Sequence, residues 1–272
     1  MHWIGWASGA RAAAMAAALV VLGARAALAA CQMTVAGGGP GFVPAGFLAA
    51  AAADHVRITF AGHASFFVES PEGVGAFTDY NRVIRPRRLP DIVTMNRSHS
   101  THYTDVVEPE IRHVLRGWDP DGGIARHDVT ERDMRVRNVP TNLRELGGGR
   151  QANGNSIFIM EAAGVCIVHL SHTHHVLASW QVQPIKDADV LLVPIDGSVT
   201  MSHEEAFDII AAVKPRLVIP MHYVSPRAVE AFTARAQSAG YPVRRHDGDT
   251  VEVSLKSLPQ PTEVLFLQGG HW

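Results

Sequence analysis

Histidines gather at the ends of apolar, strand-like segments in this chain of 272 residues, which contains 15 histidines. The first group lies in residues 97–103 and includes His99 and His102. The second group lies in residues 171–175, and the third is His222 alone. Because loops at strand ends carry functional residues in many proteins that mix helices and strands, these histidines are candidates for a common site.

Neutral imidazole is the commonest protein ligand of zinc and of related metals. Several imidazoles that converge from separate strand ends therefore predict a metal site. A histidine without such a context is more often an exposed or hydrogen-bonded structural residue, and we assign no role to His2, His55, His113, His127, His203, His246 and His271.

Composition excludes several other classes of protein. The two cysteines, Cys31 and Cys166, are too few for a disulfide scaffold or a cysteine-rich zinc module. The formal charge of −2 argues against nucleic acid as the main partner. Neither a glycine-rich phosphate loop nor a Gly-x-Ser-x-Gly elbow occurs, and 47% hydrophobic residues predict a large packed core.

The N-terminus has the features of a secretory signal peptide over residues 1–30. Residues 12–24 are apolar and uncharged, follow Arg11, and are too few for a spanning helix of ~18 to 20 residues. Residues 28–31 also resemble the lipobox of bacterial lipoproteins, in which Cys31 would carry a lipid anchor. The alternative is ordinary cleavage after Ala29, and both alternatives predict an exported, periplasmic protein.

The remaining chain divides into a Gly- and Pro-rich tether at 31–53, a globular domain at 54–257 and a C-terminal extension at 258–272. Strand patterns dominate the first part of the domain, and strands alternate with helices toward its end, which predicts an α+β fold with sheets between helical layers. The expected strands are 56–60, 65–69, 73–78, 91–95, 134–139, 156–161, 165–170, 190–195 and 217–220, and the expected helices are 109–115, 202–213 and 226–239.

The order of these features resembles the metallo-β-lactamase superfamily, most of all its ascorbate-6-phosphate lactonase-like branch, over about residues 56–255. The resemblance implies an αββα four-layer sandwich with a metal site at one edge, between the two sheets. The segments that carry the resemblance are Ile58–Phe66, Thr78-Asp79, Asp91–Val93, Asn153–Ser156, His169-Leu170 and Val218–Tyr223.

The site motif departs from the pattern of that family. The signature His-x-His-x-Asp-His corresponds to residues 97–102, where Arg97 replaces the first histidine and only the second and fourth ligands remain. The next family histidine is missing near Asn142, and His172 stands where the family has a bridging aspartate. The resemblance therefore implies one divalent ion rather than two, and its expected ligands are His99, His102, His172 and His222.

This pattern predicts an exported metal-dependent hydrolase that acts on a small ester, lactone or phosphoester through a metal-activated water. Zinc is the expected ion, with iron, manganese and copper as alternatives. His174 or His175 could shuttle a proton, and Arg97 could bind an anionic substrate. His63, Tyr103 and Tyr223 are assigned to the wall of the site.

A second interpretation is a protein that binds a metal or ligand without hydrolysing anything. The loss of a carboxylate and two histidines is typical of an inactivated enzyme. The added histidines indicate instead a rebuilt site, which could support redox chemistry.

Overall fold

The computed structural model describes residues 54–97, 99–144 and 149–269. The predicted signal peptide at 1–30 and the tether at 31–53 lie outside these ranges. Within them, no helix has the length and apolar character that crossing a membrane requires.

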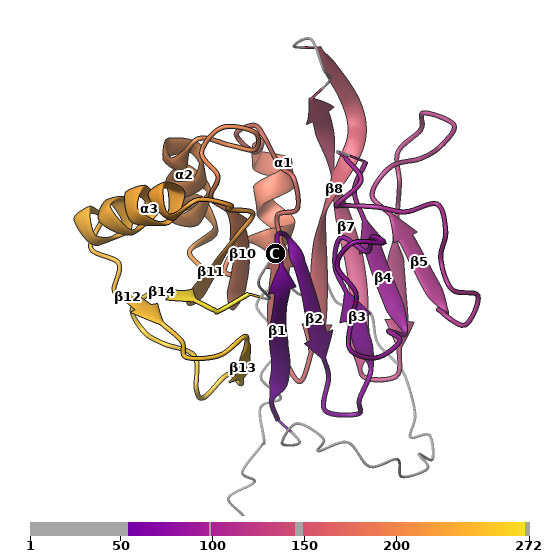
Figure 1. The fold of residues 1–272 in the computed structure, drawn as a ribbon, viewed down its shortest axis with the longest axis horizontal. Coiled ribbons are helices and arrows are strands. Elements are labelled where there is room, and N and C mark those ends of the chain that lie inside the picture. Colours follow the sequence, from indigo (N-terminus) through magenta and orange to yellow (C-terminus); the bar gives the residue numbers. More distant parts are fainter. Residues whose placement is uncertain (1–53, 98, 145–148, 270–272) are drawn as a thin grey trace, which may run out of the picture.

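Two β-sheets pack face to face, and three helices lie beside one of them (Figure 1). The six-stranded sheet has the order β13-β1-β2-β3-β4-β5, and the eight-stranded sheet has the order β12-β14-β11-β10-β9-β8-β7-β6. The strands of the first sheet are β1 (Val56–Gly62), β2 (Ser65–Glu69), β3 (Gly75–Phe77), β4 (Ile92–Met95), β5 (His113–Arg116) and β13 (Thr250–Val253). Those of the second are β6 (Asp128–Glu131), β7 (Met134–Arg144), β8 (Arg150–Ala162), β9 (Val165–His169), β10 (Val190–Pro194), β11 (Leu217–Met221), β12 (Val243–Arg245) and β14 (Glu263–Phe266).

The burial of each strand follows from its sequence. In β1, Val56, Ile58 and Phe60 are buried in the core, whereas Arg57 and Thr59 alternate with them on the other face. The consecutive strands β9, β10 and β11 pair in parallel and are buried along their whole length. Their unbroken apolar runs indicate that both faces of the sheet are covered at this point.

Three apolar clusters define the layers of the molecule. One cluster joins β1, β2 and β4 of the first sheet to β8–β11 of the second, and so fills the space between the sheets. A second cluster joins β9–β11 to α2 (His203–Val213) and α3 (Pro226–Ser238). A third covers the outer face of the six-stranded sheet with side chains from irregular segments, including Tyr80, Ile84, Ile111 and Trp118.

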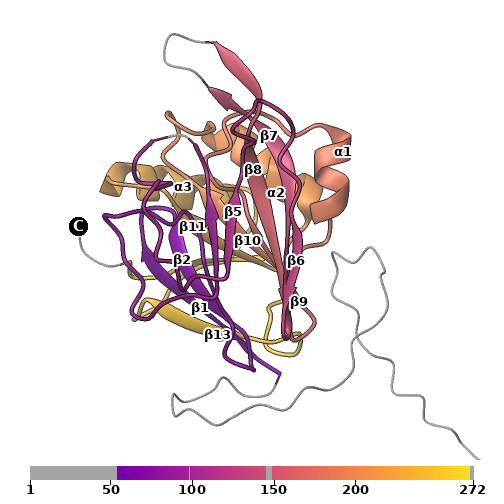
Figure 2. The ribbon, with the colours of Figure 1, turned by 90° about the vertical axis from the view of Figure 1, so that its right-hand side faces the viewer.

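The predicted α+β sandwich is confirmed. Among the described residues, helices cover only the eight-stranded sheet, and they include the short α1 (Ser179–Val182) with the 3-10 turn η1 (Gln183–Ile185). Figure 2 shows the same arrangement from the side on which β5 and β6 lie.

The two long helices begin where the sequence provides caps. Ser202 accepts a hydrogen bond from the backbone of Glu205, whose side chain bonds back to Ser202, and the pair forms a capping box for α2. Ser225 caps α3, and Pro226 occupies its first turn. The predicted helices at 202–213 and 226–239 are thus confirmed.

Two predictions about local structure differ from the structure. The predicted helix over 109–115 is wrong, because His113–Arg116 pairs in parallel with β4 as an edge strand. The predicted strands 134–139 and 156–161 are parts of one longer hairpin, in which β7 and β8 pair as far as Arg144 and Arg150. The hairpin extends past the other strands (Figures 1 and 2).

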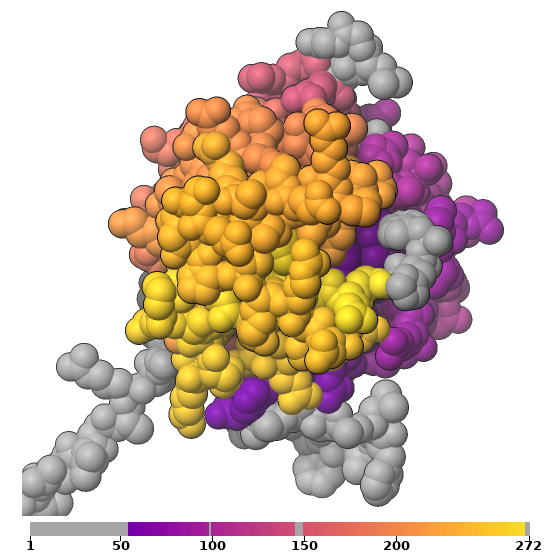
Figure 3. Space-filling model, turned by 60° about the vertical axis from the view of Figure 1, so that its left-hand side comes forward, coloured from indigo at the N-terminus to yellow at the C-terminus, as the bar shows by residue number. Residues whose placement is uncertain are grey.

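The C-terminal segment also differs from the sequence-based expectation. Residues Glu263–Phe266 form β14, an interior strand between β11 and β12, and not an extension outside the fold. Val264 and Leu265 are fully buried on opposite faces of the sheet. Figure 3 shows this C-terminal part, in yellow, packed against the orange segments that contain α3.

The interior position of β14 predicts that Leu265→Ala lowers the free energy of unfolding by about 2–5 kcal/mol, the usual cost of truncating a buried leucine. The matched control Leu89→Ala should cost less than about 1 kcal/mol, because this leucine is 44% exposed. Urea unfolding of both variants measures the difference. Equal costs would contradict a core role for β14.

Candidate metal centre

Four histidines from three separate places in the chain meet between the ends of the two sheets. His63 lies in the turn between β1 and β2, His99 and His102 lie in the loop after β4, and His222 directly follows β11. Each offers one ring nitrogen, and these four atoms lie within 4.8 Å of one another. We call these residues the four-histidine group.

A backbone contact between the two sheets fixes His63 and His222. The N–H of His222 donates to the carbonyl of His63 at 2.6 Å, and the ring centroids lie 4.1 Å apart. Both residues adopt the left-handed conformation, with φ of 53° and 54°. Residues other than glycine seldom adopt this conformation, and they retain it where surrounding contacts impose it, often at functional sites.

A tight turn holds His99 and His102 side by side. The N–H of His102 donates to the carbonyl of His99 at 2.9 Å, and the ring centroids are 4.4 Å apart. The hydroxyl of Thr101 lies 2.8 Å from Nδ1 of His99. His102 is fully buried and His99 is exposed, so the pair spans the distance from the interior to the surface.

Asp79 orients the ring of His102. Its carboxylate lies 2.7 Å from Nδ1 of His102, and both side chains are fully buried. Burial raises the pKa of Asp79 to about 6, so that above this pH the carboxylate is ionised and accepts a hydrogen bond from Nδ1–H of His102. Nε2 of His102 then carries the lone pair, and this buried atom has no hydrogen-bond partner in the described structure.

Asp196 plays the same part for His222, at 3.0 Å from Nδ1. Burial acts to raise the pKa of Asp196, but hydrogen bonds from His222, Thr200 and the backbone of Ser198 outweigh it and hold the pKa well below its ordinary value. Nε2 of His222 is buried and, within the described residues, also lacks a partner. A carboxylate behind the ring is the usual arrangement for a histidine that binds a metal.

These features fit a divalent ion. Buried nitrogens such as Nε2 of His102 and His222 are costly when nothing binds them, and a metal would satisfy them. Burial, followed by the neighbouring imidazoles, lowers the pKa of His63 to about 2, which keeps its ring in the neutral form that metals bind. The four-histidine group contains no carboxylate ligand.

His172, a predicted ligand, lies beside this group and not within it. Its ring centroid is 4.9 Å from that of His102, 5.0 Å from that of His222 and 5.2 Å from that of His99. The residue is 5% exposed, and neither ring nitrogen has a hydrogen-bond partner among the described residues. His172 is thus a fifth imidazole at the centre, and its role as a ligand stays a prediction.

His174 and His175 turn toward the β7–β8 hairpin. Nδ1 of His175 lies 2.8 Å from the carbonyl of Val176, and Nε2 accepts from the N–H of Asn142. Burial, followed by the charge of Arg144, lowers the pKa of His174 to about 4. In the described ranges no ring contact joins either histidine to the four-histidine group, so their catalytic roles stay predictions.

Arg97 is exposed and lies in the loop after β4 that also carries His99 and His102. Its N–H donates to the side chain of Asn155 at 3.1 Å, and Nδ2 of Asn155 lies 3.5 Å from the carbonyl of His172. This backbone contact brings Arg97 close to the loop of His172, and its predicted role in binding an anion stays untested.

Asp196 is absent from the residues predicted for the site, and His63 is predicted only for its wall. Two signals are present in the sequence: Asp196 follows an apolar strand end, as the predicted histidines do, and Gly62-His63 forms the turn between two strands. Neither signal shows which residues face one another across the two sheets.

Comparison with known proteins agrees with this fold. A family model described as "Beta-lactamase superfamily domain" matches residues 57–222. The chain belongs to the metallo-β-lactamase superfamily. Membership of the ascorbate-6-phosphate lactonase-like branch stays a prediction.

Relatives within this superfamily are named as hydrolases. A protein of Opitutus terrae named "UPF0173 metal-dependent hydrolase" is 27% identical over 73% of this chain and its own full length. One from Pyrococcus furiosus with the same family name is 28% identical over 62% of this chain and 84% of its own. A crystal structure from Thermotoga maritima, described as a putative Zn-dependent hydrolase of the superfamily, has a TM-score of 0.59 and 26% identity, and covers 79% of this chain and 100% of its own.

The carboxylate behind His222 predicts that Asp196→Asn weakens metal binding by roughly 10- to 100-fold, the usual effect of losing such a partner. The matched control Asp121→Asn, in an exposed loop after β5, should bind metal like the parent protein. Competition with a chromogenic chelator measures both affinities. Equal affinities for the two variants would show that Asp196 does not support a metal ligand.

Proposed function

We propose that this member of the metallo-β-lactamase superfamily is a metal-dependent hydrolase that works with one divalent ion. The observation that carries the proposal is the convergence of four imidazoles, whose ligand nitrogens lie within 4.8 Å of one another, two of them backed by the carboxylates of Asp79 and Asp196. The printed names of the relatives support hydrolysis as the reaction.

The residues of the centre divide into those that hold the ion and those that orient them. His63, His99, His102 and His222 would bind the ion, and His172 stands near enough to bind it or to bind a water beside it. A bound divalent ion lowers the pKa of a water ligand and polarises a carbonyl or phosphoryl group. Asp79 and Asp196 keep the protons of His102 and His222 on Nδ1, away from the centre.

The chemistry of the donors supports zinc as the ion. Imidazole nitrogens suit zinc, copper, iron and nickel, whereas magnesium, calcium and manganese prefer oxygen ligands. Since the four-histidine group is neutral, the ion keeps its charge of +2 and attracts an anionic water ligand or substrate. Arg97 on the rim would favour a substrate that carries a carboxylate or phosphate. We therefore propose a small ester, lactone or phosphoester as the substrate.

One observation favours a second function. An all-imidazole centre without a carboxylate also suits a redox metal, and the fifth imidazole, His172, would allow a higher coordination number than zinc hydrolases need. The chain would then bind a metal, or catalyse a redox step, without hydrolysis. The two functions can be separated by esterase, lactonase and phosphodiesterase assays with zinc, iron and copper, added one at a time. Hydrolysis with zinc supports the first function, and no hydrolysis with any of the three metals supports the second.

The single-ion centre predicts one equivalent of tightly held metal per chain, measured by elemental analysis of protein purified without added metal. His222→Ala should lose this ion on dialysis, because it removes a ligand from the centre. His113→Ala is the matched control and should keep the ion. His113 lies on the edge strand β5, and its side chain contacts Glu131 on β6 and not the metal centre. Two tightly held equivalents, or a fully loaded His222→Ala variant, would contradict the proposal.

We also propose that the chain is exported to the periplasm, with or without a lipid on Cys31. The apolar run at 12–24 supports this proposal. N-terminal sequencing and mass spectrometry of protein from the native host should give a mature chain that begins at Ala30 or Cys31, heavier by an acyl anchor in the lipidated case. Retention of Met1 in cytoplasmic protein would contradict export.

A further inference from the structure

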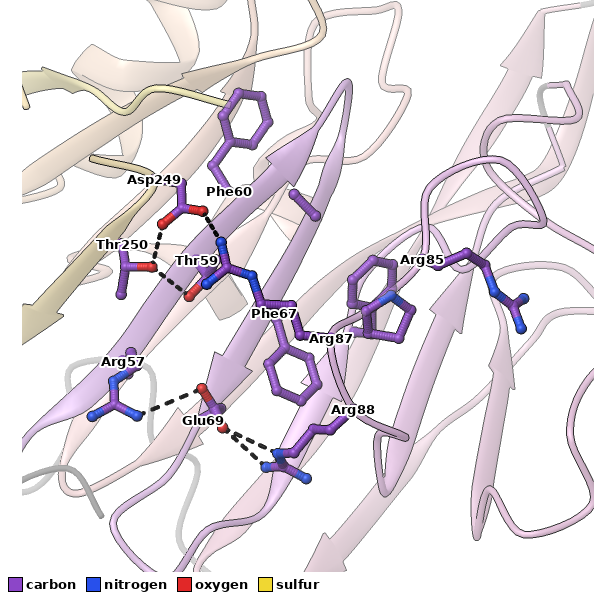
Figure 4. Close-up of a pocket in the computed structure, with 13 residues that line it drawn as sticks. Arg57, Thr59, Phe60, Phe67, Glu69, Arg85, Arg87, Arg88, Asp249 and Thr250 are labelled. Carbon is purple, nitrogen blue, oxygen red and sulfur yellow. Dashed lines mark hydrogen bonds and ion pairs between the residues drawn. The ribbon is translucent and has the colours of Figure 1, made fainter. Parts of the chain in front are cut away.

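A cavity lies on the outer face of the six-stranded sheet, on the side that no described helix covers. Its volume is about 610 Å³, within the range of small-molecule sites. Ala61 and Phe67, on β1 and β2, provide an apolar floor, and Phe77 on β3 is fully buried behind it. Figure 4 shows the labelled side chains around it.

Arginines surround this apolar floor. The lining contains four arginines and two acidic residues, which are Arg57, Arg85, Arg87, Arg88, Glu69 and Asp249. The lining therefore carries an excess of two positive charges. Two acidic side chains just outside it, Glu108 beside Arg85 and Glu252 beside Arg57, balance this excess and hold these arginines in place, so the binding of an anion depends on donors that the ion pairs leave unused.

The ion pairs position the guanidinium groups in advance of any ligand. Arg87 donates to Asp249 at 2.7 Å, and Arg88 donates to Glu69 at 3.1 Å while it stacks over the ring of Phe67 at 4.8 Å. A guanidinium has five N–H donors, and the bond to Asp249 uses one from Arg87. The side chain of Arg87 is 84% exposed, so an incoming anion reaches it from solvent.

The cavity is separate from the metal centre. Its floor uses outward side chains of the six-stranded sheet, such as Phe67, whereas Val56, Ile58 and Phe66 on the same strands face the core between the sheets; Phe60 belongs to that core and also lines one end of the cavity. None of the five histidines at the centre lines the cavity. A ligand bound here would not contact the proposed metal ligands.

We propose that this cavity binds a small organic anion with an apolar body. Aromatic and aliphatic side chains on the floor favour the apolar body, since its burial removes apolar surface from water. The arginines on the rim favour a ligand with a carboxylate, sulfonate or phosphate group, because the N–H donors of a guanidinium match the oxygens of these groups. The exposed Arg87 and the apolar floor together specify an amphiphilic ligand, and not an inorganic ion.

The fluorescent anion 8-anilinonaphthalene-1-sulfonate is a suitable probe, because it joins aromatic rings to a sulfonate. Titration of the folded, full-length protein should give one saturable site, from which decanoate displaces the probe and decanol does not. Arg87→Gln should raise the Kd of the probe by about tenfold, which corresponds to the loss of one charge-assisted hydrogen bond. Arg82→Gln is the matched control, since this exposed arginine is near Arg87 in sequence and does not line the cavity.

A second variant tests the location of the site. Thr59→Phe should abolish binding, because the new ring projects from β1 into the cavity while an aromatic residue remains favourable in a strand. Thermal unfolding of each variant should show that the fold is intact. Equal Kd values for Arg87→Gln and Arg82→Gln, binding that survives Thr59→Phe, or displacement by decanol as effective as by decanoate would overturn the proposal.

Discussion

The centre depends on two hydrogen bonds from an imidazole to a carboxylate, from His102 to the fully buried Asp79 and from His222 to the partly buried Asp196. Each bond places the ring proton on Nδ1 and turns Nε2 toward the space where the imidazoles converge. Without these partners, the same rings would be buried polar groups free to choose another tautomer or rotamer. The orientation of the His102 and His222 rings is therefore set by the carboxylates of Asp79 and Asp196 and not by the histidines alone.

The two sheets bring these pairs together at a cost in backbone conformation. Asp79, His63 and His222 all have positive φ. For residues other than glycine, this backbone conformation costs about 1–3 kcal/mol of free energy each. Buried asparagines help to hold the loops in place. The amide of Asn81 donates to the carbonyls of Asp79 and Thr101, and Asn96 joins Asp79 to the backbone of β8.

Much of the fold could be predicted from the sequence, because alternating or continuous apolar runs and helix caps are local signals. The capping box at Ser202 and the buried run of β10 are examples. The edge strand β5 and the interior strand β14 could not be recognised in this way. Each is short, and its conformation is decided by pairing with a neighbouring strand. For β14 this neighbour is β11, which is distant in sequence.

The site could be predicted in part for the same reason. Strand ends and histidine spacing place His99, His102 and His222 at one edge, and the structure brings these three together. The role of His63 and of Asp196 depends on contacts across the two sheets, such as the bond from His222 to the carbonyl of His63, and no local pattern shows such contacts. His172 is near the centre for a local reason, since it follows β9.

X-ray absorption spectroscopy of the metal-loaded protein tests the central claim most directly, because it reports the atoms around the ion. A single ion held by imidazoles should show a shell of nitrogen or oxygen at about 2.0–2.1 Å with strong outer scattering from imidazole carbons, and no metal–metal distance. A metal–metal distance of about 3.5–4 Å would contradict the account, because it would show the two-metal site that the residues of this centre are inferred to have lost.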